Sequence, residues 1–265
     1  MTGTQPATQY IDTTRPHPAR VYDWFLGGKD NYPVDEQLGR RITEIDQGAV
    51  RAARANRAFM HRATRTLAED GMRQFLDIGT GIPTEPNLHQ IAQSVAPDAR
   101  VVYVDNDPIV LAHANALLRG TPEGVTEYVQ ADARDPGAIL EQAAQVLDFG
   151  RPVALSLIAL LHFVADEDGA HAVVSTLLDA LAPGSCLVLS TMTADFEPEN
   201  VKKGIAAYAA GGVTLVARSR DEVAAFFEGL DLLDPGVVPV ADWRPTEPPD
   251  GAGPVSLYGA VGRKP

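Results

Sequence analysis

The sequence predicts an α/β fold in which helices cover both faces of a doubly wound, mostly parallel sheet of seven strands. Short apolar runs rich in β-branched residues alternate with helical segments from about residue 71 onward. The runs are almost continuously apolar, which is typical of strands that are buried on both faces. A Pro- and Gly-rich loop at residues 244–254 is too short for a crossover helix, so we expect the last two strands to form an antiparallel pair at one edge.

A helical extension is expected before the sheet. Residues 1–13 are polar, lack periodicity and are expected to be disordered. Residues 14–70 are expected to form a helical lid or extension, with helices over 19–26, 33–45 and 48–69. In the third helix, apolar residues fall on one side, and the other side carries Arg51, Arg54, Arg62 and Arg65. We expect this basic side to be a solvated surface or a site for an acidic partner.

Residues 71–265 are expected to form the ligand-binding domain. Strands are predicted at residues 75–78, 101–105, 125–130, 153–157, 186–191, 237–240 and 255–261. Helices are predicted at residues 87–95, 108–118, 137–147, 166–181 and 218–227. In such a sheet, ligands bind beyond the carboxyl ends of the strands, where the strand order reverses.

Composition narrows the possible partners and location. The chain has 22 basic and 35 acidic residues and a net charge of −13, which argues against non-specific binding of nucleic acid. It has no apolar run of membrane-spanning length and no signal-peptide pattern at its start, so we expect a cytoplasmic protein without a membrane partner. The single cysteine, Cys186, permits no disulfide framework within one chain. The histidines show no metal-ligand spacing with acids or cysteines, so no metal site is expected.

The first strand ends in a glycine-containing turn, Asp77-Ile78-Gly79-Thr80-Gly81. Glycines allow the backbone to turn sharply and to approach a ligand closely. A tight strand–helix turn without any ligand is the alternative interpretation. Pro83 stands where the third glycine of the dinucleotide-binding pattern is usual, which argues against a pyrophosphate site.

Acidic residues also end the second and third strands. Asp105, followed by Asn106, lies 24 positions after Gly81. An acid roughly 20 positions beyond such glycines is placed to accept hydrogen bonds from a ribose diol. Asp107 is instead predicted to cap the helix that begins at Pro108. The third strand ends in Asp132-Ala133, where a carboxylate can accept from an adenine amino group, and Asp135 is predicted to cap the next helix.

These strand ends resemble the first three motifs of class I methyltransferases, on residues 76–81, 103–105 and 130–133. Residues 15–32, RPHPARVYDWFLGGKDNY, resemble the opening signature of a bacterial S-adenosyl methyltransferase-like family long listed as a domain of unknown function. The resemblance covers nearly the whole chain from about Ile11. It implies a Rossmann-like class I methyltransferase fold that binds S-adenosylmethionine (SAM) and releases S-adenosylhomocysteine (SAH).

The opening segment is interpreted as a lid over the cofactor, mostly because of that resemblance. Paired glycines, a lysine and an amide offer conformational freedom and hydrogen-bond donors for the methionine carboxylate. The alternative is a helix–turn–helix join whose aromatic residues fill the core. The candidate residues are Tyr22, Gly27, Gly28, Lys29 and Asn31.

The fourth strand contains Ser156, a candidate cofactor contact that lacks the glycine neighbours of a nucleophile elbow. The strand is followed by Leu160-Leu161-His162-Phe163, which resembles a segment of small-molecule methyltransferases in which a histidine faces the ligand. A neutral imidazole there would accept a proton from the nucleophile, so His162 is the candidate catalytic residue. Packing beside the methionine moiety without chemistry is the alternative.

The leading hypothesis is therefore a SAM-dependent methyltransferase acting on a small molecule. A SAM- or SAH-binding protein without turnover is the first alternative, because the acid-or-amide, Pro-Pro, aromatic motif of amino-methyltransferases is absent after the fourth strand. An NAD-dependent oxidoreductase is the second, disfavoured by Pro83 and by the closing antiparallel pair.

Overall fold

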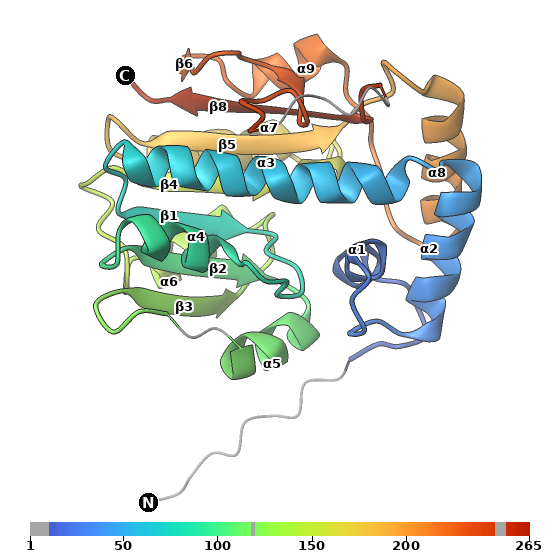
Figure 1. Ribbon diagram of the computed structural model, residues 1–265, viewed down its shortest axis with the longest axis horizontal. Coiled ribbons are helices and arrows are strands. Elements are labelled where there is room, and N and C mark those ends of the chain that lie inside the picture. The colour runs from blue at the N-terminus through green and yellow to red at the C-terminus, as the bar shows by residue number, and fades with distance from the viewer. Residues whose placement is uncertain (1–10, 118–119, 247–252) are drawn as a thin grey trace, which may run out of the picture.

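The computed structural model describes residues 11–117, 120–246 and 253–265 and confirms the doubly wound, mostly parallel sheet (Figure 1). The strands are β1 Gln74–Ile78, β2 Arg100–Asp105, β3 Val125–Gln130, β4 Ala154–Ile158, β5 Cys186–Met192, β6 Asp231–Leu232, β7 Val238–Pro239 and β8 Leu257–Arg263. They lie in the sheet in the order β3-β2-β1-β4-β5-β8-β6, and β7 also pairs with β8. Strands β1 to β5 are parallel, and β8 is antiparallel to β5.

The antiparallel end differs in two details from the expectation. β7 and β8 pair antiparallel as predicted, but β8 lies inside the sheet, between β5 on one side and β6 and β7 on the other. The eighth strand, β6, was not predicted, because its two residues are exposed and form no apolar run. Two short strands therefore share the outer edge of β8.

Helices precede the sheet and cover both of its faces. They are α1 Pro18–Leu26, α2 Pro33–Ile45, α3 Ala49–Glu69, α4 Leu88–Val95, α5 Pro108–Leu117, α6 Pro136–Ala143, α7 Ala170–Asp179, α8 Pro198–Ala210, α9 Arg220–Ala225 and the short 3₁₀ helix η1 Leu161–Phe163. Helix α8 was not predicted. Its start follows sequence rules all the same, with a proline and the acidic Glu199 in the first turn.

Alternate residues of each central strand enter two separate cores. Leu76 and Ile78 of β1 pack toward α6, α7 and α9, whereas Phe75 packs toward α3 and α4. Because both faces are covered, five consecutive residues of β1 are buried, as the continuous apolar run predicts. Figure 1 shows α3 lying along one face of the sheet. Phe59 and Leu67 of α3 are almost fully buried there, so this helix is part of the sheet's core.

The N-terminal helices α1 and α2 pack with α3 and α8 in a third apolar cluster that includes Val21, Phe25, Leu38 and Tyr208. In Figure 1 this cluster lies at the carboxyl end of the parallel strands. The expectation of disorder for residues 1–13 falls largely on residues 1–10, which lie outside the described residues. Within the described part of the chain, no helix is long and apolar enough to cross a membrane.

The basic side of α3 is not simply a solvated surface. Arg62 donates to the carbonyls of Val240 (2.7 Å) and Trp243 (2.8 Å), and Arg51 donates to that of Gly253 (2.7 Å). Several N–H groups in one planar guanidinium can bind more than one carbonyl. The arginines of α3 thereby bind the loop before β8 to the body of the protein.

We expect Arg62→Ala to lower the free energy of unfolding by about 1.5–3 kcal/mol, because half-buried charge-assisted hydrogen bonds to two carbonyls are lost. Arg65→Ala, at an exposed position of the same helix, is the matched control and should change it by no more than about 0.5 kcal/mol. Urea denaturation of both variants measures the difference. Equal effects would contradict the role assigned to Arg62.

Candidate functional site

A cavity of about 420 Å³ lies at the carboxyl ends of β1 to β4, within the size range of small-ligand sites. The lining comes from the turns after these four strands, from α1 and the residues before it, from α3 and from residues 212–214. The predicted site residues that line it are Tyr22, Asp77, Gly79, Thr80, Gly81, Asp105, Asn106, Asp132 and Ala133. Those that do not are Gly27, Gly28, Lys29, Asn31, Ser156 and His162.

The turn after β1 has a conformation that requires glycine. Gly79 and Gly81 have φ of 76° and 68°, in the left-handed region that side chains disfavour. A Cβ on Gly79 would also lie 2.7 Å from Leu160 Cδ1, because the turn after β4 packs directly against it. Between the glycines, the Thr80 hydroxyl donates to the carbonyl oxygen of Asp77 (3.0 Å). The two glycines therefore leave the backbone of the turn open to the cavity at their own positions.

Asp77 is a buried carboxyl at the floor of this turn. The pKa of Asp77 is raised to about 7, mainly by burial and least by the neighbouring Asp105, against the opposing effects of Arg57 and the Thr80 hydroxyl. Arg57 extends from α3 to the cavity wall, and its Nη2 donates to the carbonyls of Thr84 and Pro86. A buried acid that is half-protonated near neutral pH favours a cation in the same cavity.

Asp105 links two neighbouring turns. Its Oδ2 accepts from the Gly81 N–H (2.7 Å) and its Oδ1 from the Asp107 N–H (3.0 Å). Burial raises the pKa of Asp105, and these two hydrogen bonds oppose the rise. A carboxylate has about four acceptor positions, so Asp105 keeps capacity for further donors. Asp107 caps α5 as predicted, because its Oδ1 accepts from the Ile109 N–H (3.0 Å).

At the end of β3, Asp132 is paired within its own turn. Arg134 donates to it from Nη2 (2.6 Å) and from Nε (3.0 Å). The side-chain hydrogen bond from Arg134 lowers the pKa of Asp132, which therefore stays ionised at neutral pH. Both residues line the cavity, so this end of it presents a polar, ionised edge. Asp135 caps α6 through the Ala138 N–H (3.1 Å), as expected.

Helix α1 is attached to the strand ends by buried charges. Arg20 Nε lies 3.2 Å from Asp107 Oδ2, and Arg20 Nη1 lies 3.6 Å from Asp35 Oδ2. The three side chains are at most 4% exposed. His17 Nδ1, which accepts from the Ala19 N–H (3.3 Å), lies 3.0 Å from Asp107 Oδ2. The ion pairs of Arg20 hold Ala19 and Tyr22 of α1 against the cavity.

The paired glycines make the turn that ends α1. Asp23 accepts from the Asp30 N–H (3.0 Å) and from Asn31 Nδ2 (2.7 Å) inside that turn. A Cβ on Gly28 would lie 1.9 Å from Asp23 Oδ1, so only glycine fits there. Lys29 is exposed. Of the lid candidates, Tyr22 lines the cavity, whereas the amide of Asn31 is hydrogen-bonded to Asp23 in the turn after α1.

His162 lies in η1 and is buried. Its Nδ1 accepts from the Met192 N–H (3.3 Å), and burial lowers the pKa of His162 to about 3, so it stays neutral. The next residue, Phe163, lines the cavity instead. Ser156 is buried within β4, where it pairs with Asp77 of β1 and Val188 of β5.

Sequence reasoning missed several cavity residues. Arg57 is one of many arginines on α3, and no local signal separates it from the others. His17 precedes α1 and was not distinguished from the rest of the opening signature. Ala159, directly after β4, has a φ of 54°, which nothing in its sequence indicates. All three depend on how distant segments meet.

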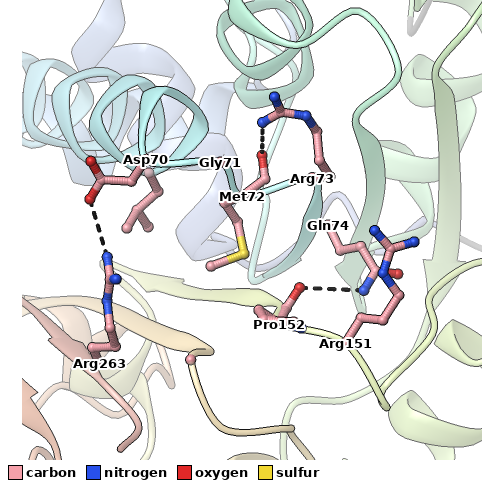
Figure 2. A pocket seen from close by; sticks show the side chains of 10 residues that line it. Asp70, Gly71, Met72, Arg73, Gln74, Arg151, Pro152 and Arg263 are labelled. Carbon is pink, nitrogen blue, oxygen red and sulfur yellow. Dashed lines mark hydrogen bonds and ion pairs between the residues drawn. The ribbon is translucent and has the colours of Figure 1, made fainter.

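A second cavity, of about 230 Å³, lies at the opposite end of the sheet, before β1 and β4 (Figure 2). Its arginines are largely engaged, since Arg263 pairs with Asp70 (3.1 Å) and Arg73 donates to the carbonyls of Ala68 and Met72. Figure 2 also shows the Gln74 amide donating to the Pro152 carbonyl. Asp70 is the one acid among the residues that line it, and it is already paired with Arg263, so the cavity at the carboxyl ends, where three strand-end acids meet, is the candidate site.

Comparisons with known proteins show what the chain is similar to. The structure resembles a DUF574 family protein from Streptomyces avermitilis MA-4680, with a TM-score of 0.94, 50% identity, and coverage of 97% of this chain and 100% of that one. It also resembles a proposed methyltransferase from Thermobifida fusca YX, with a TM-score of 0.89, 40% identity and 96% coverage of each chain. The plantazolicin methyltransferase BamL shares the fold, with a TM-score of 0.53, 11% identity, and coverage of 93% of this chain and 96% of that one. No curated protein matches the sequence significantly.

The family model described as S-adenosyl methyltransferase matches residues 4–265, nearly the whole chain. Its range includes the helices that cover the cavity as well as the sheet that forms its floor. The resemblance inferred from the strand ends and the opening segment is thereby confirmed. The chain belongs to the S-adenosyl methyltransferase family, whose cofactor is SAM.

Proposed function

We propose that this protein transfers the methyl group of SAM to a small-molecule acceptor in the cavity at the carboxyl ends of β1 to β4. The observation that supports it most is the convergence of three acidic strand ends, Asp77, Asp105 and Asp132, on one cavity beside a glycine turn. SAM carries a sulfonium and an ammonium group, and buried acids stabilise such charges. We further propose the cytoplasm as its location, from the composition and the single cysteine.

For the nucleoside, we assign the ribose hydroxyls to Asp105 and Asn106 and the adenine to the turn at Asp132 and Ala133. The Asp105 side chain is preorganised for this role, because hydrogen bonds from the Gly81 and Asp107 N–H groups hold it in place. Its carboxylate oxygens can still accept hydrogen bonds from the ribose hydroxyls. Asp132 keeps its charge through Arg134. Rigid acceptors at both ends favour one orientation of the nucleoside.

For the methionine part, we assign the ammonium to Asp77 and the carboxylate to Arg57. Arg57 uses Nη2 for the carbonyls of Thr84 and Pro86, and its remaining N–H groups are available to a carboxylate. The lid assignment is then kept for Tyr22 of α1, while Gly27, Gly28, Lys29 and Asn31 shape the turn behind it.

For the transfer step, we propose positioning rather than acid–base catalysis. His162 stays neutral with Nδ1 occupied, so we assign it a packing role. The Tyr22 hydroxyl donates a hydrogen bond to the Ala53 carbonyl (2.9 Å), so we assign it no acid–base role either. The sulfonium of SAM is already an activated methyl donor, so in-line alignment supplies most of what the step needs.

A small acceptor is supported by the cavity wall beyond the strand turns, where Met60, Leu160, Phe163 and Val213 are apolar. The fold relative BamL was crystallised with SAH and a triazolic desmethylPZN analogue. Turnover is tested by following tritium from methyl-labelled SAM into the small-molecule fraction of a cell extract. Label above that of the Asp105→Ala variant supports a methyltransferase, and cofactor binding without transfer supports the non-catalytic alternative.

We expect SAM and SAH to bind and NAD not to bind, and Asp105→Ala to weaken SAH binding by roughly 1.5–3 kcal/mol, the range for hydrogen bonds to a charged group. Asp135→Ala removes an exposed helix-capping acid outside the cavity lining and is the matched control, with unchanged affinity. Calorimetry on both variants measures the difference. Tight NAD binding, or equal affinity of the two variants, would contradict the assignment.

We expect SAH affinity to rise as the pH rises to about 7 and to level off above it. In the free protein Asp77 holds a proton below that pH, and a bound ammonium expels it, so each pH unit below 7 costs up to about tenfold in affinity. Calorimetry near pH 6.5 in buffers of different ionisation enthalpy measures the released proton.

Asp77→Asn is the control for that pH dependence, because it removes the titrating group while keeping the shape of the side chain. It should bind SAH weakly with a flat pH profile. Because the raised pKa makes the ionised carboxylate unfavourable in the folded state, Asp77→Asn should also raise the free energy of unfolding at pH 8, by about 1–3 kcal/mol, and less at pH 5. An unchanged pH profile in this variant would assign the titration to another group.

A further inference from the structure

The turn after β4 places Ala159 in an unfavourable conformation at the cavity wall. Ala159 and Arg244 are the two non-glycine residues with left-handed φ among those described, and Ala159 lines the cavity. Such conformations persist where the surrounding structure imposes them, and they concentrate at functional sites. Ser190 of β5 holds the main chain at this turn, since its carbonyl oxygen and its Oγ both accept from the Ala159 N–H at 3.0 Å.

Ser190 is the first member of a buried hydrogen-bond chain that ends on α1. Its Oγ donates to Asn56 Oδ1 (2.6 Å), Asn56 Nδ2 donates to the Tyr22 hydroxyl (3.0 Å), and Tyr22 donates to the Ala53 carbonyl (2.9 Å). Asn56 and Ser190 are fully buried, and burial raises the pKa of Tyr22. The chain crosses from β5 through α3 to the helix that covers the cavity.

The direction of every hydrogen bond in this chain is determined. Tyr22 has one proton, which the Ala53 carbonyl accepts, so Tyr22 can only accept from Asn56. That requirement orients the Asn56 amide and leaves its oxygen for the Ser190 hydroxyl. With each hydrogen bond fixed in direction, breaking the buried chain at one member leaves the polar atoms of its neighbours unpaired.

We propose that Asn56 is a positioning residue that couples the seating of α1 over the cavity to the turn at Ala159. Both ends of the chain, Tyr22 and Ala159, line the cavity, whereas Asn56 does not. Closure of the lid and shaping of the β4 turn then occur together. The inference rests on the proposed cofactor site, because its measurable consequence is how SAH orders α1.

The first test compares Asn56→Ala with wild type in the full chain, by calorimetry with SAH and by hydrogen exchange of residues 18–26. Bound SAH should protect this segment in wild type, and Asn56→Ala should bind at least tenfold more weakly without that protection. Gln93→Ala is the matched control, because Gln93 is a buried amide bonded to Ala99 and Thr121 away from the cavity. It should keep the wild-type affinity and the wild-type protection.

Ser190→Ala tests the same coupling from the β5 end of the hydrogen-bond chain. It keeps the proposal testable if Asn56→Ala does not fold. Ser190 is not among the cavity-lining residues, and its side chain reaches α1 only through Asn56. The Ala159 N–H keeps the main-chain carbonyl of residue 190 as acceptor. We expect protection of residues 18–26 by SAH to fall, with a smaller loss of affinity than in Asn56→Ala.

The coupling is contradicted if Ser190→Ala binds SAH within twofold of the wild-type affinity and SAH protects residues 18–26 in it as in wild type. The same result for a folded Asn56→Ala contradicts it too. Wild-type protein that fails to bind SAH contradicts the proposed function itself and removes the basis of the coupling. The two failures are thus distinguished by the wild-type titration.

Discussion

The placement of the N-terminal helices depends on the buried pairing of Arg20 with Asp107 and Asp35. Each carboxylate also satisfies main-chain groups, since Asp107 caps α5 and Asp35 accepts from the N–H groups of His17 and Tyr32. Removing one member of such a group costs about 3–5 kcal/mol, because it leaves a buried charge without a partner. The pairing therefore joins the end of β2 to both α1 and α2, and it determines where the cavity is covered.

Arginine side chains bind the loops around this site. Arg57 and Arg62 of α3 donate to loop carbonyls, and the buried Arg218 donates to those of Leu161 and Val164 and to Asp166. One guanidinium has several N–H groups and can therefore bind several carbonyls at once. In a chain with net charge −13, these cations act as structural cross-links between segments far apart in the sequence.

The acids at the strand ends carry a cost in the free protein. Burial raises the pKa values of Asp77 and Asp105, so two neighbouring carboxyls resist ionisation. Arg134 pairs with Asp132, whereas Asp77 has no cation within hydrogen-bonding distance among the described residues. The proposed binding of the SAM ammonium at Asp77 would offset this cost, because a nearby positive charge favours the ionised carboxylate.

Local patterns in the sequence determined the sheet, its parallel strands and the strand-end residues that meet at one edge. Continuous apolar runs and glycine turns act over a few residues, and the carboxyl ends of parallel strands necessarily share an edge. Tertiary structure alone decided the rest. His162, chosen because its segment resembles one in small-molecule methyltransferases, is buried with its Nδ1 occupied, whereas Arg57 and Asn56 acquire their roles from segments that meet only in the folded chain. The position of β8 inside the sheet and the left-handed turn at Ala159 likewise depend on contacts between distant residues, which no local pattern encodes.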